Sequence, residues 1–180
     1  MMPKIRLIIL WLLYTFFLVW GSGALPGKPL TIVFIIIGTF LGMLLPKAMT
    51  IGADLFLVSH SKDQESLVSR FSVVARKDAM SLFPTTKVGQ LLYSWPFLFA
   101  FGVTALYIVT STSGWFGKSL VLGMGLALVS DLFVSNRDKL VLKTRWFSAF
   151  HAKLSNTELD IFVYGSLAGF ILLSILSLVS

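Results

Sequence analysis

The sequence predicts an all-α integral membrane protein, a single helical bundle with about five transmembrane helices that extends over residues 1–180. Of the 180 residues, 56% are hydrophobic and 13% are charged, and the mean hydropathy is +0.87. Soluble domains average about half apolar and about a quarter charged residues. Five uncharged stretches approach the roughly 20 residues that a helix needs to cross about 30 Å of hydrocarbon. Basic residues are also distributed unequally between successive loops.

The five predicted spans lie at approximately 7–25, 30–45, 91–109, 119–134 and 161–179. The second and fourth spans are short and need flanking residues to cross a bilayer. An alternative for the first span is a cleaved signal peptide, because Lys4 and Arg6 precede an apolar run that ends in small residues. The apolar run is long for a signal peptide, and the other spans keep their orientation in both cases.

The positions of the basic residues predict the orientation in the membrane. Thirteen of the fifteen Lys and Arg residues lie in the N-terminal segment, in 46–90 or in 135–160, and the other two are Lys28 and Lys118. Cytoplasmic loops carry such an excess, so we expect a cytoplasmic N-terminus and an external C-terminus in a cell inner (plasma) membrane. The net charge of +7 then reflects topology and does not indicate nucleic-acid binding.

Small residues four positions apart occur in three of the spans, where they allow close approach of helices that have no hydrophobic driving force between them. We therefore expect spans two, four and five to form the tightly packed centre. The residues are Gly38, Gly42, Gly123, Ala127, Gly165 and Gly169. Five aromatic residues near span ends are predicted to anchor the helices at headgroup level: Trp11, Trp20, Tyr93, Trp95 and Trp115.

Two cytoplasmic segments complete the predicted architecture. Residues 46–90 form a loop that contains a helix over 63–83, and residues 51–58 are alternatively a continuation of span two. Residues 139–154 form an interfacial amphipathic helix, with one apolar stripe of Leu140, Phe147, Phe150 and Leu154. Its basic residues face anionic lipid headgroups or simply obey the positive-inside rule.

A capping box precedes span five. Ser155 is followed three residues later by Glu158, and reciprocal bonds between such residues satisfy two amide groups at a helix start.

One ionisable residue is expected inside the membrane, where burial costs at least roughly 2.5 kcal/mol. Asp131 follows Lys118 by about 20 Å of helix. Together with Asp54 and His60 it forms a weak candidate for a metal or proton site. His151 is an alternative to His60 as the residue that contributes a nitrogen atom. The other interpretation is a structural ion pair with a basic residue such as Lys47 or Lys87. No cysteine, P-loop, G-x-S-x-G or H-E-x-x-H motif is present, and we expect no cofactor.

Several stretches resemble an uncharacterised family of small membrane proteins from candidate-phyla bacteria, itself distantly similar to inner-membrane metal-dependent hydrolases. They are GMLLP at 42–46, TSTSG at 110–114, GLALVSD at 125–131 and LSNTEL at 154–159. The hydrolase-like pattern has Asp after Leu-Pro, His-Ser at the start of a later span and His four residues before the span-four Asp. This chain has Lys47, Tyr93-Ser94 and Ala127 there, so the resemblance implies a non-catalytic relative.

The sequence therefore predicts a multi-pass membrane protein of structural or interaction function, with the lipid bilayer, a membrane protein or a second copy of the chain as partner. The alternative is a metal-dependent membrane hydrolase that acts on a lipid or envelope substrate. A small transporter ranks third, because no inverted repeat is visible.

Overall fold

The computed structural model describes residues 3–23, 28–59, 91–111, 114–147 and 154–179. Within these ranges the chain is all-helical, with six helices and no strand. The helices are α1 (Pro3–Gly21), α2 (Pro29–Ser59), α5 (Trp95–Thr110), α6 (Trp115–Ser135), α7 (Lys139–Trp146) and α8 (Asn156–Val179). The predicted helix over 63–83 lies outside the described residues.

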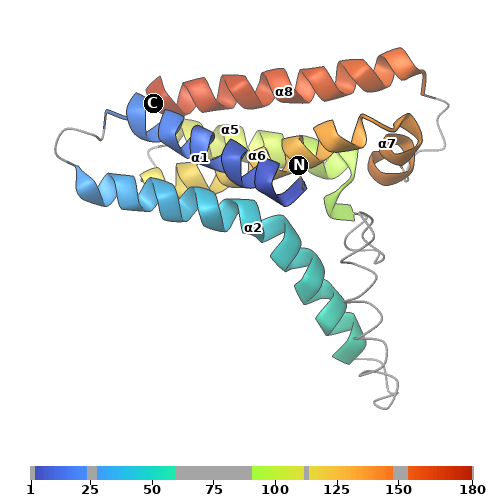
Figure 1. Ribbon diagram of the computed structural model, residues 1–180, viewed down its shortest axis with the longest axis horizontal. Helices are drawn as coiled ribbons and strands as arrows, with labels where there is room; N and C mark the ends of the chain where they lie inside the picture. The colour runs from blue at the N-terminus through green and yellow to red at the C-terminus, as the bar shows by residue number, and fades with distance from the viewer. Residues whose placement is uncertain (1–2, 24–27, 60–90, 112–113, 148–153, 180) are drawn as a thin grey trace.

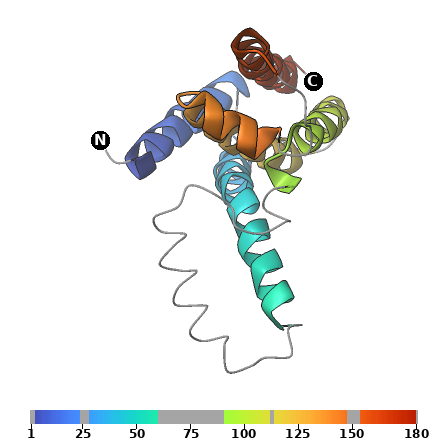
Figure 2. The same cartoon turned by 90° about the vertical axis from the view of Figure 1, so that its right-hand side faces the viewer.

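Helix α6 occupies the centre of the bundle. It packs against α1, α2, α5, α7 and α8, and its contact with α2 is by far the most extensive. Figures 1 and 2 show the long helices running beside it, with the short helix α7 across one end. The end of the bundle that carries α7 is called the α7 end below.

Helix α2 is longer than the predicted span 30–45 and follows the alternative in which residues 51–58 continue that span. It continues past Leu45 to Ser59, and Pro46 lies inside it. A proline in a helix removes one hydrogen bond and clashes with the carbonyl four residues before it, so it bends the helix without always ending it. Helix α2 changes direction in its second half and leads away from the bundle (Figure 1).

Helix α7 buries a different face from the predicted stripe. Leu140 is 70% exposed, whereas Leu142 and Trp146 are fully buried. These two residues are four positions apart and therefore share a helix face, and they pack into a core formed with Leu128 and Leu159. Helix α7 ends at Trp146, and residues 148–153 of the predicted interfacial helix lie outside the described residues.

The predicted capping box is confirmed at the start of α8. The Ser155 amide donates to Oε2 of Glu158 at 2.7 Å, and the Glu158 amide donates to Oγ of Ser155 at 3.2 Å. Two amides that would otherwise lack helical partners are thereby satisfied.

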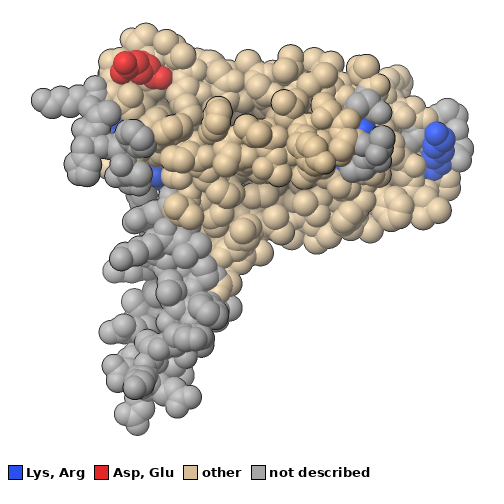
Figure 3. All heavy atoms as spheres, turned by 180° about the vertical axis from the view of Figure 1, so that it is seen from behind, with Lys and Arg blue, Asp and Glu red and all other residues tan. Residues whose placement is uncertain are grey.

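Charged and apolar surfaces are separated along the bundle. Figure 3 shows one face on which uncharged atoms cover the length of the bundle, and the coloured charged groups lie toward its two ends. Large apolar side chains are exposed along the outward faces of the long helices, among them Leu13, Phe16, Phe99, Ile161 and Leu172. Such a surface suits hydrocarbon and would be unfavourable in water.

Candidate functional site

Three of the six predicted packing residues lie where α2 and α6 approach most closely. A Cβ atom added to Gly42 would lie 2.0 Å from the Leu120 carbonyl oxygen, and one added to Gly123 would lie 2.3 Å from the Thr39 carbonyl oxygen. A Cβ at Gly38 would meet Oγ of Ser119. The backbones of α2 and α6 are therefore in direct contact, as only glycine allows.

The small residues of α8 have a different environment. A Cβ atom added to Gly165 or Gly169 would meet nothing within 4 Å among the described residues. These glycines line a groove between α5 and α8, so α8 does not share the tight packing that the sequence predicted for it. Ala127 of α6 is buried.

Polar side chains connect α1 and α2 inside the apolar bundle. The Trp11 indole donates to Oγ1 of Thr39 at 3.2 Å, and Oγ1 of Thr15 lies 3.2 Å from the same oxygen. Thr39 itself donates to the Ile35 carbonyl at 2.7 Å. Trp11 is thus a partner in helix packing, in contrast to its predicted position as an anchor at the headgroup level.

Asp131 pairs with a cation at the α7 end. Its Oδ2 atom lies 3.7 Å from Nη2 of Arg145 on α7, with 31% of the Asp131 side chain and 9% of the Arg145 side chain exposed. The guanidinium also lies over the Tyr93 ring, with Cζ 4.1 Å from the ring centroid. The cluster of Asp131, Arg145 and Tyr93 thus joins α6, α7 and the segment before α5.

The surroundings of Tyr93 and Arg145 restrict their chemistry. Burial of the hydroxyl raises the pKa of Tyr93 above its ordinary value, the charge of Asp131 raises it further, and Arg145 acts in the opposite direction. Tyr93 is therefore a neutral group at physiological pH. Nε of Arg145 is buried and has no hydrogen-bond partner among the described residues.

A second charged cluster lies at the same end. Lys139 forms an ion pair with Asp160 and donates to Oδ1 of Asn136 at 2.7 Å. The side-chain amide of Asn136 donates from Nδ2 to Oδ1 of Asp160 at 3.3 Å. These contacts join the α6–α7 turn to the first turn of α8, and Asp138 caps α7 by accepting from the Leu140 amide at 2.9 Å.

Asp131 is the one proposed metal ligand whose side chain the structure describes. Asp131 faces Arg145, and no group of three His, Asp or Glu residues that would hold a metal ion occurs among the described residues. The backbone of Asp54 lies in the part of α2 that leads away from the bundle (Figure 1). His60, His151 and Lys87 lie outside the described residues, and Lys47 is exposed on α2.

Sequence reasoning missed the importance of Arg145 and Tyr93. From the sequence, Arg145 belongs to the basic residues of the predicted interfacial helix, and Tyr93 belongs to the predicted aromatic anchors. A carboxylate such as Asp131 inside a membrane needs a cation as partner, but the sequence contains fifteen basic residues and does not indicate which one pairs with it. Only the folding of α7 back onto α6 selects Arg145.

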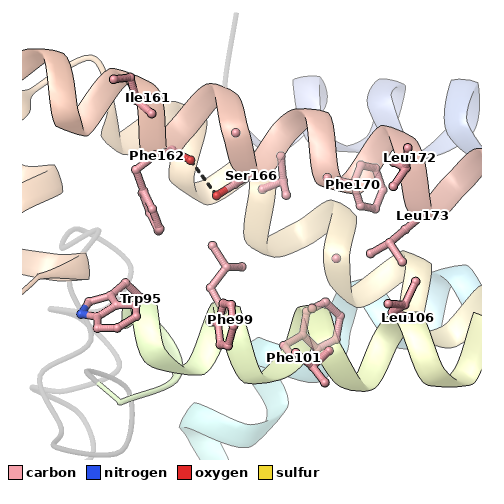
Figure 4. A pocket seen from close by; sticks show the side chains of 17 residues that line it. Trp95, Phe99, Phe101, Leu106, Ile161, Phe162, Ser166, Phe170, Leu172 and Leu173 are labelled. Atoms are coloured by element: carbon pink, nitrogen blue, oxygen red, sulfur yellow. Dashed lines mark hydrogen bonds between the residues drawn. The ribbon is translucent and has the colours of Figure 1, made fainter.

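Two grooves open along the bundle. The α5–α8 groove has a volume of about 600 Å³, and Figure 4 shows side chains of α5 and α8 that line it, with Trp95 near one end. The α1–α6–α8 groove is larger, about 1080 Å³, and its lining includes Leu7, Tyr14, Ser130 and Arg137. The walls of both grooves are predominantly apolar.

The described structure defines a helical protein with three helices long and apolar enough to cross a membrane: Pro29–Gly52, Trp115–Ser135 and Asn156–Val179. In length and composition these helices suit a membrane protein. Comparison of the chain with protein-family models, curated proteins and solved structures finds no significant match.

Proposed function

We propose that the chain is a non-catalytic, multi-pass protein of a bacterial inner membrane with a structural or interaction role. The observation that carries the proposal is the pairing of Asp131 with Arg145. A carboxylate neutralised by a buried guanidinium stabilises the packing of α7 on α6, and one carboxylate alone does not provide the several ligands that a catalytic metal needs.

The proposed topology has five spans, formed by α1, α2, α5, α6 and α8. The shorter apolar segments Leu7–Gly21 and Trp95–Thr110 support it, because they belong to helices that pack beside the three longer ones. A cytoplasmic α7 end is supported by the basic residues that gather there, and the turn before α2 and the start of α6 carry only Lys28 and Lys118.

An interaction role is supported by the length of α2. Its 31 residues extend about 46 Å, which exceeds the hydrocarbon thickness of about 30 Å. In the proposed orientation the second half of α2 leads into the cytoplasm, where it is available to a protein partner or to a second copy of the chain.

Metal analysis tests the non-catalytic assignment. The purified full-length protein in detergent is compared with Asp131→Asn for bound metal and, by circular dichroism, for helix content and thermal stability. We expect no stoichiometric metal in either protein and a lower melting temperature for Asp131→Asn. Stoichiometric metal that is lost in a well-folded Asp131→Asn variant would instead support the metal-dependent hydrolase.

A further inference from the structure

We infer that the α1–α6–α8 groove binds one anionic phospholipid, with its phosphate at Arg137 and an acyl chain between α1 and α8. The inference rests on the proposed membrane placement and goes beyond it by naming one site and one class of ligand. Four features of the groove carry it: its length, its lining, the position of its cation and the contrast with the α5–α8 groove.

The length of the groove matches one leaflet of a bilayer. On α1 the lining extends from Leu7 to Phe17, which is about 15 Å of helix. Half of a hydrocarbon core of about 30 Å has the same thickness. The groove therefore suits a single acyl chain that lies parallel to the helices.

The lining is apolar except for a few groups with defined positions. Tyr14 and Ser174 both belong to the lining and are hydrogen-bonded to each other at 2.8 Å, so their hydroxyls are satisfied. Ser130 and Arg137 lie toward the α7 end, and Arg137 follows the last residue of α6 by two positions. Apolar walls with a cation at one end are complementary to an amphiphile with one anionic head.

Arg137 is the cation best placed for a lipid phosphate. Its side chain forms no hydrogen bond or ion pair with any residue that the structure describes, whereas Lys139 and Arg145 at the same end both have acidic partners. The neighbouring Asp138 carboxylate accepts amide protons at the start of α7. An arginine binds phosphate through planar, charge-assisted hydrogen bonds.

The α5–α8 groove provides an internal comparison. Its lining also extends over about a leaflet of helix, from Trp95 to Leu106, but contains no basic residue. We expect acyl chains to occupy this groove without preference for the headgroup. An apolar partner helix in the α1–α6–α8 groove would fill the space between its apolar walls but would leave Arg137 without an anion.

Native mass spectrometry of the full-length protein in detergent tests the inference. The protein is titrated with phosphatidylglycerol or with phosphatidylcholine that carries the same acyl chains. We expect tighter binding of phosphatidylglycerol, and we expect Arg137→Gln to reduce that preference about five-fold, the effect of one basic residue at an anionic lipid surface. Arg137→Lys should keep most of the preference, and Lys143→Gln is the control on a basic residue that does not line the groove.

A second pair of variants tests the acyl-chain position. Ser130→Phe fills the α1–α6–α8 groove and should abolish the tight binding of phosphatidylglycerol. Gly102→Phe fills the α5–α8 groove and should leave that binding unchanged. Equal affinity of the wild type for both lipids would overturn the inference. So would concentration-dependent dimerisation that Ser130→Phe abolishes, because the occupant would then be a second copy.

These outcomes are distinguishable from a failure of the proposed function. Site-directed labelling reports the number of spans without added lipid. A five-span protein that shows no preference for phosphatidylglycerol loses only the lipid site.

Discussion

At the residue scale, the contacts at the α7 end depend on a few charged and aromatic side chains. Arg145 is almost completely buried and faces both Asp131 and the Tyr93 ring. Removing one member of a buried ion pair is unfavourable because the remaining charge has lost its partner. Substitution of Asp131, Arg145 or Tyr93 should therefore change the stability of the protein in a different, measurable way.

The Asp131–Arg145 pair predicts strong coupling between the two residues. Asp131→Asn should lower the free energy of unfolding by about 1–3 kcal/mol, since it leaves the Arg145 charge unpaired. The double variant Asp131→Asn with Arg145→Met should recover part of the loss, as measured by denaturation in mixed micelles. Asp138→Asn is the matched control, because asparagine also caps helices. Additive effects of the two single substitutions would contradict the pairing.

Tyr93 predicts an alkaline dependence of stability. Its pKa in the folded protein is raised above the unfolded value of about 10, mainly by burial. The folded state therefore holds the proton more tightly, and its contribution to stability is complete below about pH 10 and decreases as the pH rises beyond that value. Between pH 8 and 11, the melting temperature of the wild type should fall more steeply than that of Tyr93→Phe. Parallel pH profiles would refute this assignment.

At the element scale, the α2–α6 contact dominates the packing of the bundle. Glycines bring the two backbones together, and Ser119 donates to the Phe34 carbonyl at 3.1 Å across the same interface. Van der Waals contact and interhelical hydrogen bonds are the main attractive terms between helices in lipid. Loss of close approach should therefore weaken the whole bundle.

Glycine substitutions separate this contact from the rest of the bundle. Gly42→Ala should destabilise the protein by about 1–3 kcal/mol, because the new Cβ would overlap the Leu120 carbonyl and force the helices apart. Gly165→Ala should be neutral or stabilising by up to about 1 kcal/mol, since its Cβ meets open space and alanine favours the helix. Chemical denaturation of both variants in mixed micelles measures the difference. Equal losses would mean that the α2–α6 contact is not decisive.

The helical architecture and the capping box were predictable because they depend on local sequence. Uncharged length indicates a helix, and Ser155 and Glu158 are only three residues apart. The sequence left the continuation of α2 beyond Pro46 as an alternative, because a proline either bends a helix or ends it. The buried face of α7 depends on how the chain folds back onto α6, so Leu142 and Trp146 were missed. Arg145 was missed for the same reason.

At the scale of the whole molecule, the separation of charged ends from an uncharged middle predicts a defined topology. In the proposed topology the α1–α2 and α5–α6 loops lie outside, and the loop before α8 lies in the cytoplasm. The chain has no cysteine, so single cysteines can be introduced without background labelling.

Labelling with a membrane-impermeant maleimide in intact cells tests this topology. Lys28→Cys and Ser111→Cys should react in intact cells, and Asn156→Cys should react only after the membrane is permeabilised. Lys28 precedes α2, Ser111 follows α5 and Asn156 is the first residue of α8, so these positions lie at helix ends. Reaction of Asn156→Cys in intact cells would contradict the proposed orientation.

The intimate contact between α2 and α6 also constrains how the protein is made. Gly42 and Gly123 are separated by 81 positions, and synthesis at about 5–20 residues per second puts roughly 4–16 s between them. During this interval α2 resides in the bilayer without its main partner. Its apolar sequence is stable alone in lipid, so the bundle assembles by lateral association after insertion. Close contact between these two backbones is therefore a late event in the biogenesis of the protein.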